Sequence, residues 1–397
     1  MKRSNRFNIR WDDPQEAKDL ALGCSTLWNK LTYKRRQSLF DDNRDFDWSS
    51  DELYDEFKSW IGSATAQQII RKNNSAWKSF FSLLDKWKEN KEEVDRPSPV
   101  GYWKDRNKDR KVLKILVRND CYTIEENGTI KLPFGLKGKI IGKPHWQGKQ
   151  GRLEVIYDRL EDCWRAYQPV EVEPRHQPSG HKTAYVDLGV IYPVTAYIEG
   201  ENTSVAYNGK PLLSKWWMFN KQIESVQSQL KEENDKYSSE RLKRLYRKRK
   251  RIFRDKMCKI IKRFVERCYK ASVDTIIAGD LTEIRDSAEY NKKANSMIHN
   301  YWSHEYLVER LRYTAENYGI ELELIDERGT SSKCPRCGSE KKVRKGRLYK
   351  CKECGVEAHR DAVGALNIGL AEGLDVSPEV INIYWNAKHS IDSRNFM

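Results

Sequence analysis

Two pairs of cysteines near the C-terminal end of the sequence constrain the fold most strongly. Cys334 and Cys337 form one C-x-x-C pair, and Cys351 and Cys354 form a second pair after thirteen intervening residues. Four thiolates at this spacing suit one tetrahedral Zn²⁺ ion, whereas the alternative is two redox-active pairs. The intervening segment is short and basic, so we expect a zinc ribbon that folds around a structural metal.

The charge balance indicates a polyanionic partner. The chain has 73 Lys and Arg against 58 Asp and Glu, which gives a net charge of +15. A basic chain gains affinity for nucleic acid by releasing condensed counterions, although a merely basic soluble protein has the same overall charge. The sequence also shows no signal-peptide core and no membrane-length apolar stretch. We therefore expect a cytoplasmic protein.

Residues 241–270 concentrate this charge in one helical segment. Fifteen Lys or Arg stand there against only Asp255 and Glu266, and regularly spaced apolar residues supply a buried stripe. Such charge runs are often solvated faces, but those faces usually mix both signs. We therefore favour contact with a nucleic-acid backbone. The predicted binding residues are Arg244, Arg247, Lys248, Arg249, Lys250, Arg251 and Arg254.

The order of the predicted elements divides the chain. A strand in residues 1–11 precedes helical patterns up to about residue 90, a proline-containing crossing, and short alternating strands from 111 to about 172. Three strands then begin near residue 183, followed by helical residues 214–270, the strand "DTIIAGD", a helix, the strand "IELELIDE" and a final helix. This second series is the element order of an RNase H-like fold.

Two aspartates in the second series are candidate catalytic residues. Asp187 ends the apolar strand "AYVD", and Asp361 stands in the first turn of the final helix. Carboxylates that converge from separate elements can hold Mg²⁺ ions for phosphodiester hydrolysis. Each aspartate alone reads more simply as a turn or helix-start residue. Their placement in this element order, with the cysteine pairs just before Asp361, favours catalysis.

The sequence resembles the TnpB family of transposon-encoded proteins, relatives of the type V CRISPR effectors. The resemblance is carried by "YVDLGV", the basic helix, "NYWSHEYLVERLRYTAENYGIELELIDERGTSSKCPRCG" and "CKECGVEAHRDAVGALNIG". It implies a multidomain α+β protein with a RuvC-like (RNase H-like) nuclease domain, an inserted zinc ribbon, a β-barrel wedge domain and a helical recognition domain. The implied ranges are 1–11 for the first wedge strand, 12–105 for the recognition domain, 106–175 for the wedge, 182–329 and 359–375 for the nuclease domain, 330–358 for the ribbon, and 376–397 for a tail.

The resemblance also implies an activity and partners. Family members are RNA-guided DNA endonucleases, hydrolases that cut beside a short flanking motif in a Mg²⁺-dependent RuvC-like site. The implied cofactors are structural Zn²⁺ and two catalytic Mg²⁺ ions held by Asp187, a further carboxylate and Asp361. The implied partners are a guide RNA from the transposon end and target double-stranded DNA, bound by a monomeric protein. The helical segment would meet the guide–target duplex through its shape and backbone.

This sequence departs from the family pattern in the strand "DTIIAGD", where the family carries a catalytic glutamate. The glutamate that the family carries before its Asp-Leu or Asn-Leu falls on Gly279 here, and Asp280 should face the other side of the strand. Asp326 and Glu327 end the neighbouring parallel strand at the same edge. We therefore predict that Glu327 replaces the missing glutamate, with Asp280 as the alternative and Glu283 less favoured.

Two rival functions follow from the same features. A nuclease-dead RNA-guided DNA-binding repressor would keep the fold, but retention of Asp187 and Asp361 argues against it. An RNase H-like DNA transposase is the other rival, and the long helical insert fits it poorly.

Overall fold

The protein was analysed as a computed structural model. It describes residues 1–41, 45–91, 95–105, 110–201, 203–234, 237–280, 297, 301, 303–326 and 333–374. The chain folds into two compact units, Met1–Val172 and Glu173–Met397. Among the helices within these ranges, none has both the length and the apolar character needed to cross a bilayer.

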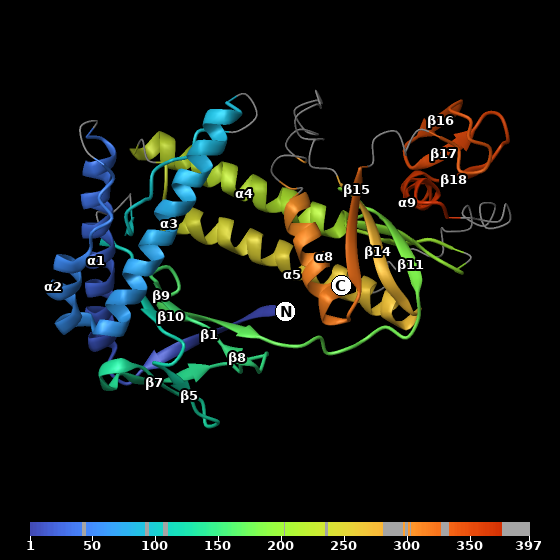
Figure 1. The fold of residues 1–397 in the computed structure, drawn as a ribbon. Coiled ribbons are helices and arrows are strands. Elements are labelled where there is room, and N and C mark those ends of the chain that lie inside the picture. The colour runs from blue at the N-terminus through green and yellow to red at the C-terminus, as the bar shows by residue number, and fades with distance from the viewer. Residues whose placement is uncertain are drawn as a thin grey trace. The chain divides into compact units, whose positions relative to one another are not determined.

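Three helices of the first unit lie side by side (Figure 1). They are α1 (Pro14–Leu39), α2 (Asp51–Ile61) and α3 (Ser63–Glu89). The side chain of Asp13 accepts hydrogen bonds from the backbone N–H groups of Gln15 and Glu16, and Pro14 occupies the first turn, so α1 begins with a strong N-cap. The predicted helical region is thereby confirmed.

An eight-stranded sheet forms the rest of the first unit. Its path is β4-β9-β10-β1-β7-β6-β5, with β8 paired to β10, and β1 pairs antiparallel with both β10 and β7. Hydrogen bonds among the described strands leave β4 and β5 as two ends, so the expected barrel is an open sheet within these ranges. The strands are β1 (Lys2–Trp11), β4 (Lys114–Val117), β5 (Thr123–Ile124), β6 (Thr129–Lys131), β7 (Lys137–Ile141), β8 (Lys149–Gln150), β9 (Leu153–Asp158) and β10 (Cys163–Glu171), with a separate ribbon of β2 (Lys104–Asp105) and β3 (Arg110–Lys111).

A five-stranded mixed sheet organises the second unit. Its order is β13-β12-β11-β14-β15, in which β11, β14 and β15 are parallel and β12 and β13 are antiparallel. This confirms that the strand ending at Asp326 is the parallel neighbour of the strand that contains Gly279. The strands are β11 (Lys182–Asp187), β12 (Val194–Ile198), β13 (Val205–Tyr207), β14 (Val273–Asp280) and β15 (Glu321–Asp326).

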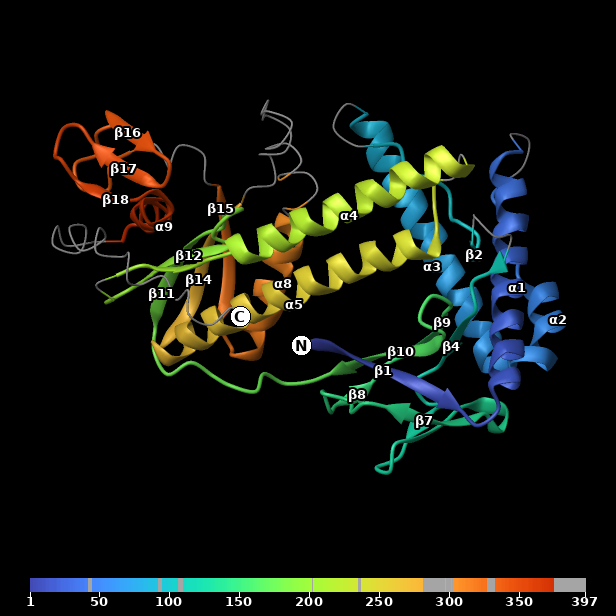
Figure 2. The same ribbon diagram turned by 180° about the vertical axis from the view of Figure 1, so that it is seen from behind.

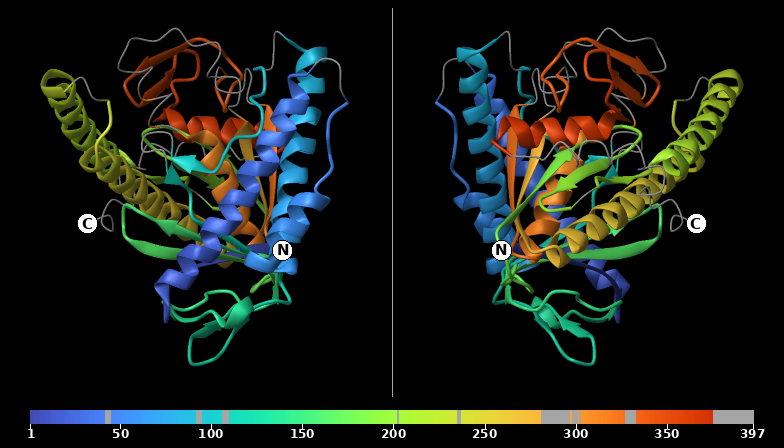
Figure 3. Two further views of the ribbon diagram at one scale, coloured as in Figure 1. Left: turned by 90° about the vertical axis from the view of Figure 1, so that its left-hand side faces the viewer. Right: turned by 90° about the vertical axis from the view of Figure 1, so that its right-hand side faces the viewer.

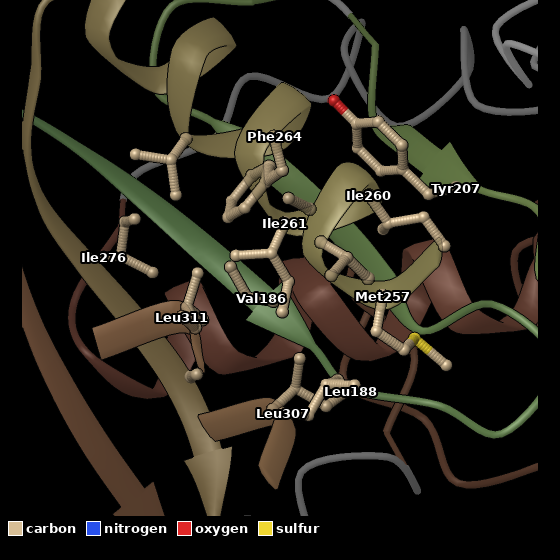
Figure 4. Packing of buried hydrophobic residues seen from close by; sticks show 14 of the residues in the cluster. Val186, Leu188, Tyr207, Met257, Ile260, Ile261, Phe264, Ile276, Leu307 and Leu311 are labelled. Atoms are coloured by element: carbon tan, nitrogen blue, oxygen red, sulfur yellow. The ribbon is translucent and has the colours of Figure 1, made fainter. Parts of the chain in front are cut away.

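The two faces of this sheet carry different helices. Val186 and Ile276 point into the main core against α5 (Glu240–Lys270) and α8 (His304–Asn317), as Figure 4 shows. Tyr185 and Ile277, one residue away in each strand, pack instead with α9 (Arg360–Ala371). Helix α9 lies across one face of this sheet (Figure 3). Side chains alternate along a strand, so the register decides which residues meet α9.

The long helices α4 (Lys210–Asn234) and α5 run beside each other (Figure 2). The hydroxyl of Ser239 accepts a hydrogen bond from the backbone N–H of Leu242 and caps α5. A small antiparallel sheet of β16 (Lys342–Lys345), β17 (Leu348–Cys351) and β18 (Glu357–His359) carries the cysteine pairs and leads directly into α9.

Candidate active site and metal centre

The four paired cysteines form one cluster. The Sγ atoms of Cys334, Cys337, Cys351 and Cys354 all lie within 4.8 Å of one another. Burial opposes ionisation of the Cys351 thiol, but backbone N–H groups of Cys354 and Glu353 lower its pKa to about 7. One tetrahedral metal, rather than two separate redox pairs, fits a single group of four sulfur atoms. The cluster can therefore hold a structural Zn²⁺ ion, in agreement with the sequence prediction.

Asp187 lies against α9 one turn from Asp361, on the α9 face of the mixed sheet. Asp187 ends β11 two residues after Tyr185, so strand alternation turns it toward α9. Gly364 lies one turn after Asp361 in α9, and a Cβ atom at Gly364 would lie only 2.5 Å from Oδ2 of Asp187. Glycine is thus what allows α9 to come so close to this carboxylate.

Two arginines form ion pairs with Asp361. Nη1 of Arg347 donates to both carboxylate oxygens at 2.8 Å, and Nε of Arg360 donates to Oδ1 at 3.2 Å. Asp361 is buried, with 8% of its surface exposed. Arg347 comes from the turn between β16 and β17, so the ribbon places a guanidinium directly on the candidate catalytic carboxylate.

Two aromatic residues border this ion pair. Arg347 lies 5.6 Å from the ring centroid of Tyr192, and the His359 ring meets the same tyrosine edge-on at 5.0 Å. Burial lowers the pKa of His359, and nearby Arg347 lowers it further, against the opposing effect of Asp361. The sequence interpretation missed all three residues, and the only available signal was the basic character of the segment between the cysteine pairs.

Among the candidate third carboxylates, Asp280 lies within the described residues, at the end of β14. Gly279 is the register partner of Ile325, and Asp280 is the partner of Asp326. Gly279 shares the α9 face with Ile277, whereas alternation puts Asp280 on the opposite face, as predicted. Glu327 and Glu283 lie outside the described residues, so Glu327 stays a prediction.

The basic helix presents most of its predicted binding residues to solvent. Arg249 differs, because its guanidinium lies 3.9 Å from the ring centroid of Trp216 and its side chain donates to Asn220. Burial also lowers the pKa of Arg249, so this arginine packs α5 against α4. The exposed members are Arg244, Arg247, Lys248, Lys250, Arg251 and Arg254.

Profiles and solved structures show what this chain is similar to. A profile described as "Cas12f1-like, TNB domain" matches residues 304–368, and one described as "Probable transposase" matches residues 167–285. Among solved structures, Cas12f1 in a complex with sgRNA and target DNA aligns at a TM-score of 0.55 and 14% identity, over 90% of this chain and 83% of that one. The fold is therefore a multidomain α+β fold of the Cas12f type.

The sequence relatives narrow this class. The TnpB-like protein ORF457 of Acidianus two-tailed virus is 29% identical over 400 residues, covering 92% of this chain and 86% of the relative. The CRISPR-associated endodeoxyribonuclease Cas12f1 of Sulfoacidibacillus thermotolerans is 28% identical over 234 residues, covering 55% of this chain and 52% of the relative. Together, the two profiles and these relatives support a protein of the TnpB family that is related to the type V effectors.

Proposed function

We propose that this chain is an RNA-guided DNA endonuclease with a RuvC-like, RNase H-like active site. The observation that carries the proposal is the approach of Asp187 to α9 at Gly364, one turn from Asp361. Asp187 at the end of β11 and Asp361 at the start of α9 would thereby contribute to one active site. The similarity to an endodeoxyribonuclease, and the fold shared with a Cas12f1 bound to guide RNA and target DNA, support the guided reaction.

The donor set suits a hard divalent cation. Asp187 and Asp361 offer carboxylate oxygens, the ligands that Mg²⁺ prefers, and no thiolate of the ribbon belongs to this pair. When bound there, Mg²⁺ would activate water and stabilise the leaving oxygen of the phosphodiester. Gly364 keeps the space above Asp187 free of a side chain, so the two aspartates can share that role.

Arg347 gives the site a resident positive charge. Its guanidinium engages both oxygens of Asp361, so a cation bound to Asp361 must share or replace these two hydrogen bonds. A guanidinium released from a carboxylate pairs equally well with a phosphate, because both present two oxygens in a plane. We propose that Arg347 holds Asp361 in place before the substrate binds and then contacts the DNA backbone.

The third carboxylate is proposed to be Glu327. Ile325 packs with the α9 cluster and is the register partner of Gly279. A strand continued beyond Asp326 would turn the side chain of residue 327 to the same face as Ile325. Asp280 belongs to the other face, which makes it the weaker candidate.

The remaining surfaces would bind the nucleic acids. The exposed arginines and lysines of α5 would contact phosphates, and the helices and sheet of the first unit would act as the recognition and wedge domains of the family. The four-cysteine ribbon would keep Arg347 in place through its zinc.

Co-purified RNA and cleavage together test this function. RNA bound to the purified protein is sequenced, and a target DNA that matches the guide is offered with Mg²⁺. We expect a single RNA species and a cut that Asp187→Asn and Asp361→Asn abolish. Bound RNA and guided DNA binding without a cut would support the repressor, and absence of RNA would support the transposase.

The relocated glutamate is tested by two variants in the same assay. We expect Glu327→Gln to lower the cleavage rate by about a hundredfold or more, and Asp280→Asn to cut close to the wild-type rate. Wild-type cleavage by Glu327→Gln would show that the third carboxylate lies elsewhere.

A further inference from the structure

A fully buried hydroxyl lies beside Asp187 in the sheet. Thr195 of β12 is the register partner of Asp187, and none of its surface is exposed. The neighbours Val194 and Ala196 point into the core that contains α5, whereas Tyr197 packs with α9. Alternation along β12 therefore turns Thr195 toward α9, onto the face that carries Asp187.

This hydroxyl has no hydrogen-bond partner within the described part of the chain. A buried hydroxyl without a partner costs free energy, which valine of nearly the same shape would avoid. Thr32 of α1, also fully buried, shows the usual solution, because its Oγ1 accepts a hydrogen bond from Nδ2 of Asn73 at 3.0 Å. The unpaired hydroxyl at Thr195 therefore needs an explanation other than fold stability.

The surroundings of Asp187 offer such an explanation. On the β14 side of β11, Val186 pairs with Ala278. The next residue of β14 is Gly279, which has no side chain to offer Asp187. On the side of β12, Thr195 is directly opposite, where paired Cβ atoms lie about 4.5–5.5 Å apart. Rotation about one side-chain bond brings a threonine hydroxyl within reach of a carboxylate at that separation.

We propose that Thr195 is a positioning residue for Asp187, an inference that rests on the proposed function. The Thr195 hydroxyl donates a hydrogen bond to the Asp187 carboxylate when that carboxylate turns to bind the divalent cation. One carboxylate oxygen is thereby fixed, while the other remains free for the metal. Helix α9 approaches the same carboxylate closely at Gly364 and limits its movement on that side. The hydrogen bond from Thr195 then selects the side-chain rotation of Asp187.

The test compares Thr195→Val, which removes only the hydroxyl, with Thr195→Ser, which retains it. We expect Thr195→Val to melt at the wild-type temperature or above without metal, yet to need about ten- to a hundredfold more Mg²⁺ for half-maximal thermal stabilisation. Thr195→Ser should restore the wild-type Mg²⁺ requirement. A Thr195→Val protein that binds Mg²⁺ like the wild type, or whose melting temperature falls without metal, would overturn the proposal.

Two further variants separate this role from a structural one. In an Asp187→Asn background, Thr195→Val should change the Mg²⁺ response no further, because the carboxylate on which it acts is gone. A further loss in that background would also overturn the proposal. Thr32→Val is the matched control, since it leaves Nδ2 of the buried Asn73 without its acceptor and should lower the melting temperature without altering the Mg²⁺ response.

The readout distinguishes this inference from the proposed function. Thermal stabilisation by Mg²⁺ is measured without RNA or DNA, so it reports on Asp187 even if guided cleavage is never observed. A wild-type protein that Mg²⁺ stabilises but that cuts no guided target would refute the proposed function alone.

Discussion

Replacing Gly364 with alanine should separate the active site from the stability of the fold. A Cβ atom at this position would lie 2.5 Å from Oδ2 of Asp187, and ordinary contact begins at 3.4 Å, so the carboxylate must move by about 0.9 Å. Alanine is favoured over glycine inside a helix by about 1 kcal/mol. Turning a side chain ~30° from its rotamer costs about 0.5–1.5 kcal/mol. These effects nearly cancel, so the unfolding free energy should stay within about 1 kcal/mol of wild type.

Cleavage should respond far more strongly than stability. A reacting group misplaced by about 1 Å typically costs a hundredfold in rate. We therefore expect Gly364→Ala to lower guided cleavage by about a hundredfold, measured on a labelled target beside a thermal melt. Gly369→Ala is the control, because its added Cβ would meet Leu374 at 2.6 Å and Tyr185 at 3.0 Å but no carboxylate. A folded Gly364→Ala protein that cuts within threefold of wild type would refute the reasoning.

Three other perturbations have expected outcomes. Cys351→Ser should release the zinc, measured as a fall from one metal per chain to none; unchanged zinc content would contradict the four-cysteine site. Arg249→Ala should destabilise the protein by about 1 kcal/mol, because Arg249 packs on Trp216. Arg251→Ala should leave the melting temperature unchanged and reduce the salt dependence of RNA binding by about one counterion, because Arg251 is exposed. The reverse result would contradict the packing role of Arg249 and the binding role of Arg251. Tyr185 donates to Glu199 and, through burial and that carboxylate, has a pKa raised from 10.0 to about 12. The folded protein therefore retains the Tyr185 proton at a pH where the unfolded chain loses it. The free energy of unfolding should fall more steeply between pH 10 and 12 in the wild type than in Tyr185→Phe. Equal slopes would show that Tyr185 does not contribute to this pH dependence.

Features with a local cause were predictable from the sequence. The strand ending in Asp187, the basic helix and the helix starting near Asp361 each follow from the periodicity of apolar residues within one segment. The cysteine cluster was equally predictable, because its ligand spacing follows from the geometry of the metal. Strand alternation also predicted correctly that Asp280 and Gly279 face opposite sides.

Features that depend on distant partners were not predictable. Arg249 looked like any other arginine of the basic helix, and only the position of Trp216 on α4 shows that it packs instead. Arg347 was one of several cations between the cysteine pairs until β17 and α9 were placed together. Thr195 required the register of β12 against β11, which no local pattern in a short apolar strand specifies.

Guide-directed cleavage tests the central claim most directly. The purified protein is loaded in turn with two RNAs that differ only in the guide segment, and each complex is offered a DNA that contains both targets with Mg²⁺. We predict that the position of the cut follows the guide, and that chelation or Asp187→Asn abolishes it. A cut at the same position with both guides, or cleavage that survives Asp187→Asn, would contradict the account.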